Sequence, residues 1–98
     1  HGRALGGDPV HALAHVGLIL FQNGRPEEAL RSVDRALSTD PRYPEGLFIR
    51  GVILLRGLDR PDEAITAFET YLDAAPFGVE RGKAKDMIAQ AREALADA

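Results

Sequence analysis

The amino-acid sequence repeats itself at an interval of about 35 residues. Residues 24–30, GRPEEAL, recur at 59–65 as DRPDEAI, and Pro41 and Pro76 keep the same offset of 35 residues. A period of this length is typical of chains built from stacked copies of one supersecondary unit. Each copy buries its apolar surface against its neighbours, so the repeat restricts the chain to a solenoid-like fold.

The two copies differ in length by one residue. Leu13 and Leu47, early in the copies, are 34 residues apart, whereas later positions are 35 residues apart. One residue is therefore inserted in the second copy, between Leu54 and Arg60. We expect the insertion to lie in a turn, where added chain length costs little free energy.

Proline and glycine residues divide each copy into two helices. Asp8 is expected to cap the first helix, and Gly24 and Gly57 are expected to end the first helix of each copy because glycine tolerates the left-handed conformation of a helix end. No stretch predicts a strand. The expected helices run from Pro9 to Asn23, from Pro26 to Asp40, from Pro44 to Gly57, from Pro61 to Ala75 and from about Val79 to about Ala96.

Large apolar, small and proline residues recur at matching places in the two copies. They are Leu13, Val16, Gly17, Leu20, Ala29, Val33, Ala36 and Pro41 in the first copy, and Leu47, Gly51, Leu54, Ala64, Phe68 and Pro76 in the second. These positions resemble the tetratricopeptide repeat, in which small residues let the two helices of a unit pack closely. Two residues depart from the pattern: Arg50 occupies an apolar place, and Tyr71 stands where a small residue is usual, so the following junction should be wider.

The resemblance implies an all-α fold of five helices, in which antiparallel helix-turn-helix units form a short right-handed α-solenoid. Repeat one would cover about 10–43 and repeat two about 44–78, followed by a capping helix over about 79–96. Residues 1–7 are expected to be a disordered or tag-like segment ahead of the domain at 8–98.

Composition excludes several classes of function. The net charge is −3 with acids and bases interspersed, so no basic stripe suggests a nucleic-acid partner. No apolar run approaches the roughly 20 residues that cross a bilayer, and no signal peptide is visible, so we expect no direct membrane insertion and a cytoplasmic rather than exported domain. The abundance of Ala, Arg, Gly and Asp suggests a bacterium of high GC content.

The resemblance also implies a site, because the first helices of the family line a concave groove that holds a peptide or helix of another protein. Ala14 and Leu18 replace the polar residues with which some members clamp a carboxylate, so that clamp is not expected. The apolar members could instead serve only to pack neighbouring first helices together. The matching positions are His11, Ala14, Leu18, Phe21, Gln22, Glu45, Phe48, Val52, Leu55, Arg56, Glu80, Lys83, Met87 and Gln90.

Neither catalysis nor cofactor binding is predicted. His11 and His15 lie one helical turn apart, but two ligands do not make a metal site and no third is evident. The acidic pair Asp62 and Glu63, like its counterpart in the first copy, lies in the first turn of a helix, where it stabilises the helix dipole. No phosphate loop, dinucleotide motif or catalytic triad is present, so the sequence predicts a non-catalytic interaction scaffold without cofactors.

Two other functions remain open at this point. The chain could be a regulatory appendage of an enzyme encoded elsewhere in a longer protein. It could also be an assembly module that packs on copies of itself or on further repeats of a longer protein, because the first helix carries more apolar surface than one partner helix can cover, including Leu18, Ile19 and Phe21. In that case we expect a two-fold homodimer through the first helix.

Overall fold

A computed structural model describes residues 9–97, and the predicted segment 1–7 and the capping role of Asp8 lie outside this range. The all-α fold of five successive helices is confirmed, and the described residues contain no strand. The helix α4 continues without a break into a π-helical turn, η1. The elements are α2 (Pro9–Gln22), α3 (Pro26–Thr39), α4 (Pro44–Val52), η1 (Ile53–Gly57), α5 (Pro61–Ala74) and α6 (Arg81–Ala96).

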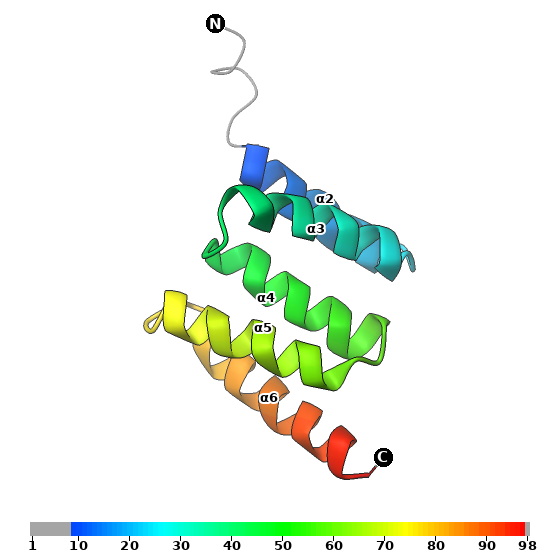
Figure 1. The fold of residues 1–98 in the computed structure, drawn as a ribbon, viewed down its shortest axis with the longest axis vertical. Helices are drawn as coiled ribbons and strands as arrows, with labels where there is room; N and C mark the ends of the chain where they lie inside the picture. Colours follow the sequence, from blue (N-terminus) through cyan, green and yellow to red (C-terminus); the bar gives the residue numbers. More distant parts are fainter. Residues whose placement is uncertain (1–8, 98) are drawn as a thin grey trace, which may run out of the picture.

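The helices stack along the longest axis of the molecule (Figure 1). The pair α2 and α3 lies at the end nearest the N-terminus, α4 and α5 follow, and α6 lies at the opposite end. Successive helices run antiparallel, so each helix packs mainly on the one before it and the one after it. Such a stack has two ends, and the helices at those ends have one neighbour fewer.

Four of the described helices begin at a proline, α2 at Pro9 among them. Pro26, Pro44 and Pro61 each stand at the first helical position, where a missing N–H costs no hydrogen bond. The helix α6 has no such proline and begins at Arg81 rather than at the predicted Val79. Residues 79 and 80 form a turn instead, in which the Glu80 N–H donates a hydrogen bond to the Tyr71 hydroxyl (3.0 Å).

Glycine allows the two helices of each unit to approach closely. A methyl group added at Gly51 would lie 2.6 Å from ring carbons of Phe68, and one added at Gly17 would overlap the side chain of Val33. Val33 and Phe68 hold equivalent places in the two units, and both are fully buried. The predicted role of the two glycines in helix packing is therefore confirmed.

The residue inserted in the second unit lies within a helix, not in the connecting loop that we expected. At the end of α2, the Arg25 N–H donates to the Leu20 carbonyl (2.9 Å). The equivalent Arg60 N–H donates to the Leu54 carbonyl (2.8 Å), across one more residue, and the π-helical turn of η1 contains the extra one. The two units thus end their first helices with the same contact despite their different lengths.

Gly57 does not adopt the left-handed conformation that we expected at the end of this helix. The left-handed conformation falls on Asp59 (φ 54°), as it falls on Gly24 (φ 78°) in the first unit. Gly57 is needed because a Cβ there would lie 2.7 Å from the Cβ of Pro26. The glycine therefore permits close approach of the π-helical turn to the start of α3.

The two departures from the repeat pattern have local explanations. Arg50 is paired with Asp34 of α3 through a hydrogen bond of 2.8 Å between Nε and Oδ1, so its charge is satisfied at the helix junction. Tyr71 is buried, and Gly78 provides the room for its hydroxyl because any side chain at position 78 would overlap it. Tyr71 lies beside the turn that precedes α6, and the wider junction expected there stays a prediction.

The core is continuous from α3 to α6. The ring of Phe68 packs edge-on against Phe48, with ring centroids 5.6 Å apart, and Tyr71 lies against the same Phe48 ring. The helix α6 closes this end of the stack with a buried stripe that includes Ala84, Ile88 and Ala91. No described helix is long and apolar enough to cross a membrane.

Candidate functional site

A groove runs across the face formed by α2, α4 and the start of α6. It consists of two adjoining hollows of about 400 and 530 Å³ and a small one of about 80 Å³. Leu18 and Ile49 line all three hollows, and Phe48 lines the two large ones. These three side chains are half-buried, so they form the shared apolar floor of one continuous groove.

The larger hollow lies where α4 faces the turn between α5 and α6. Its wall is mostly apolar and includes Tyr71, Ala75 and Val79. Val79 is 98 % exposed, and Phe77, two residues earlier in the same turn, is 96 % exposed. Single exposed apolar residues are ordinary on a protein surface, but Val79 also lines an apolar hollow. This end of the groove can therefore accept an apolar side chain.

The second large hollow has a charged rim. Phe21 and Val52 continue the apolar floor, while Arg56, Lys83 and Asp86 stand around it. Arg56 Nη2 donates to Gln90 Oε1 (3.1 Å), which holds the guanidinium at the edge of the hollow. Because two of the three charged groups are cationic, this end carries a modest positive charge.

The small hollow contains a cluster of hydrogen-bonding groups at the start of α2 and α4. The Tyr43 hydroxyl donates to Glu45 Oε1 (2.6 Å), and His11 Nδ1 lies 2.9 Å from that hydroxyl and 3.2 Å from the same Glu45 oxygen. The hydrogen bond from Tyr43 lowers the pKa of Glu45 below its ordinary value of 4.5. Burial opposes this effect to a lesser extent, and His11 adds a smaller lowering of its own. Glu45 is therefore a carboxylate at neutral pH and links two successive first helices.

This cluster does not form a metal centre. The rings of His11 and His15 are nearly parallel, with centroids 6.3 Å apart, so their nitrogens do not converge on one point. Among residues 9–97, no group of three or more potential ligands is placed to hold a metal ion. The histidines instead belong to the polar rim of the groove.

The structure brings most of the predicted groove residues into these hollows but not all of them. Gln22 lies exposed near the end of α2, and Leu55 packs against the core around Phe68, so neither lines a hollow. Met87 lines the groove and is at the same time a buried core residue. The residues that do line a hollow are His11, Ala14, Leu18, Phe21, Glu45, Phe48, Val52, Arg56, Glu80, Lys83, Met87 and Gln90.

Four residues that line the groove are not among the predicted ones: Ile49 on the floor, and Asp86, Tyr71 and Val79 on the walls. Ile49 follows Phe48 in a helix that is apolar on most sides. The spacing of apolar residues in this helix therefore does not show whether Ile49 faces the core or the groove. Val79 was assigned to a helix, although it stands in the preceding turn. An indication for Val79 existed in Gly78, which favours a turn rather than a helix interior.

Comparison with known families gives one match. A family model described as tetratricopeptide repeat matches residues 17–79, which is more than half of the chain. A search of curated proteins returned no match. The matched segment contains the C-terminal part of α2 from Gly17, the whole of α3 to α5 and the turn that carries Val79.

Proposed function

Because the chain belongs to the tetratricopeptide repeat family, whose repeats generally mediate protein–protein interactions, we propose that its groove binds an apolar segment of another protein. The observation that carries the proposal is the shared floor of Leu18, Phe48 and Ile49, which makes two large hollows one continuous surface. An extended segment or one face of a helix would place an apolar side chain in each hollow.

The polar groups of the groove suit recognition rather than catalysis. A general base that works near neutral pH needs a pKa raised towards that range, whereas the pKa of Glu45 is lowered by its hydrogen bond from Tyr43. Arg56 and Lys83 lie on the rim, where they can orient a partner by charge. We therefore infer a non-catalytic scaffold that acts without a cofactor.

The test begins with peptides selected for binding from a random displayed library, and compares variants at two adjacent residues of α2. Leu18 lines the groove, whereas Ile19 points away from it and is exposed. Leu18→Asn should weaken the selected peptides at least about tenfold, as expected for loss of an apolar anchor. The matched Ile19→Asn variant should leave their affinity unchanged. Equal losses in both variants, or peptides indifferent to Leu18→Asn, would refute groove binding.

Phe48 provides a second test because it could serve the groove, the core or both. Phe48→Ala should weaken peptide binding by at least about 1 kcal/mol while helicity, measured by circular dichroism, is retained. Its contacts with Phe68 and Tyr71 mean that some loss of melting temperature will accompany this change. A lower melting temperature with unchanged affinity would assign Phe48 to the core alone.

A further inference from the structure

The helix α2 has an apolar face that no other described part of the chain covers. Val16 is 45 % exposed and Ile19 is 42 % exposed, and Ala12, one turn earlier, is also exposed. The spacing of four and three residues places the three side chains in one stripe along the helix. We call this stripe of Ala12, Val16 and Ile19 the outer face of α2. It is distinct from the groove, because none of its three residues lines a hollow.

The second unit shows what covers the same positions when a neighbour is present. At the offset of 34 residues, Ala12, Val16 and Ile19 correspond to Gly46, Arg50 and Ile53 of α4 and η1. Gly46 and Ile53 are buried, and Ile53 is 0 % exposed.

All three positions are covered by α3, the second helix of the preceding unit. A Cβ at Gly46 would lie 3.1 Å from Leu37 Cδ2, Arg50 pairs with Asp34 at 2.8 Å, and Ile53 shares a core cluster with Ala29 and Val33. The covering element is thus an amphipathic helix whose small and branched residues meet the apolar positions of its neighbour.

From this equivalence we propose that the outer face of α2 docks an amphipathic helix of a partner, lying on α2 as α3 lies on α4. The two faces differ at one place, because Val16 stands where α4 has Arg50. Asp34 is half-exposed and is held by Arg50, so an acid in its place on α2 would face Val16 with no cation to pair with, whereas an apolar side chain would cover Val16. The partner helix therefore carries an apolar residue at that position.

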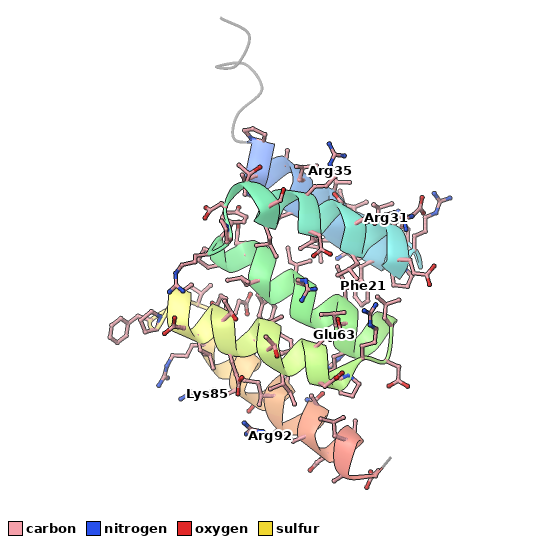
Figure 2. The ribbon with its side chains drawn as sticks, in the orientation of Figure 1. Phe21, Arg31, Arg35, Glu63, Lys85 and Arg92 are labelled. Carbon is pink, nitrogen blue, oxygen red and sulfur yellow. The ribbon has the colours of Figure 1, made fainter. Side chains whose placement is uncertain are left out.

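Charge defines one edge of the partner helix. Arg31 and Arg35 of α3 are exposed, and neither forms an ion pair with an acid in residues 9–97. Figure 2 shows Arg35 on the side of α3 turned away from α4, towards the end of the stack that α2 occupies. Thr70, which holds the place of Arg35 in the second unit, is half-buried, whereas Arg35 is exposed. The edge of the docked helix that runs beside α3 is accordingly acidic.

A second copy of this chain fits the outer face of α2 less well. The α3 helix of a second copy is already covered by α2 and α4, and the free side of its α6 presents Lys85, Ala89 and Arg92 instead of branched apolar residues. Contact between two α2 helices would bring no carboxylate to Arg31 and Arg35, because α2 contains no acidic residue. The homodimer predicted from the sequence is therefore the weaker candidate.

The experiment uses the whole chain and two helical peptides. Both have the sequence of residues 25–40 with Arg31→Lys for a lactam bridge to Glu27, because a free helix of this length is marginal in water. One peptide retains Asp34 and the other carries Asp34→Leu. Binding is followed by methyl NMR of Val16 and Ile19. The Asp34→Leu peptide should shift these methyl signals and bind at least about fivefold more tightly than the Asp34 peptide.

The matched variant of the chain is Val16→Arg, which reproduces the arginine of α4. Its preference should reverse in favour of the Asp34 peptide, because the pair of Arg50 and Asp34 is then re-created on α2. Non-specific apolar binding would not reverse the preference between the two peptides. No saturable shift at either methyl, shifts confined to Leu18 and Ile49 of the groove, or no reversal in Val16→Arg would each overturn the proposal. Dimerisation of the chain alone, abolished by Ile19→Glu in sedimentation equilibrium, would assign the face to a second copy.

Discussion

The helices α2 and α4 occupy the same place in successive repeats, yet the same residue pattern has different consequences in the two. Isoleucine stands at equivalent positions in both, as Ile19 and Ile53, and the first is 42 % exposed whereas the second is fully buried. The difference arises from the neighbour, since α3 covers that face of α4 and no described helix covers that face of α2. In a stacked repeat, an apolar position therefore becomes core or docking surface according to its place in the array.

The largest expected effect is a difference between these two isoleucines. Ile53→Ala should lower the free energy of unfolding by about 2–5 kcal/mol, because it leaves a cavity beside Ala29 and Val33. Ile19→Ala removes the same atoms from an exposed site and should cost less than about 1 kcal/mol. Urea unfolding of the two variants measures both values. Similar losses would mean that another part of the chain covers α2 in solution.

A smaller effect is expected at the glycines that join the helices within each unit, where the two repeats should behave alike. Gly17→Ala and Gly51→Ala should each destabilise the chain by about 1–3 kcal/mol, because the added methyl group meets the buried Val33 or Phe68. Gly82 in α6 provides the control, since nothing lies near its missing Cβ. Gly82→Ala should stabilise the chain by about 0.5–1 kcal/mol through helix propensity alone. Thermal unfolding monitored at 222 nm, the usual helix wavelength, compares the three, and a stable Gly51→Ala chain would contradict the packing.

The smallest effect concerns the hydrogen bonds that join the starts of α2 and α4. The pKa of Glu45 is lowered in the folded chain, so its carboxylate contributes stability above its ordinary pKa of 4.5 and loses it as the pH falls through the lower folded value. The wild-type chain should therefore lose a few tenths of a kcal/mol more than Glu45→Gln on acidification below pH about 5, because the group is exposed and the effect is screened. Urea unfolding at several pH values tests this prediction. Identical pH profiles for the two chains would mean that the hydrogen bonds of Glu45 do not stabilise the contact between α2 and α4.

Much of the architecture could be predicted because short sequence signals within each repeat determine where its helices begin and which residues are equivalent. The prolines at 26, 44 and 61 fix helix starts, and the period alone identifies equivalent residues such as Val33 and Phe68. The start of α6 was misplaced since no proline marks it and the helix lies outside the repeat. Its first two expected residues form a turn held by the hydroxyl of Tyr71, a contact that nothing in the local sequence announces.

The groove was harder to predict than the fold. Periodicity identifies the apolar residues of a helix, but α4 is apolar towards α2, α3 and α5 together, so Ile49 and Leu55 could not be assigned to groove or core. Which of them lines the groove depends on the angles at which three helices meet. Those angles follow from side-chain volumes at the junctions, including the unusual Tyr71 and the paired Arg50, and not from any spacing along the chain.

The π-helical turn at Ile53–Gly57 lets two repeats of different length adopt the same packing. The turn accommodates the inserted residue before Arg60. The residues of α5 therefore keep the same contacts as their equivalents in α3, and the position of α6 is unaffected by the insertion. A search that assumes a strict period would lose the alignment at this point, although the three-dimensional equivalence persists. Insertions of single residues can thus be tolerated at the ends of first helices, because they leave the packing of the following helix unchanged.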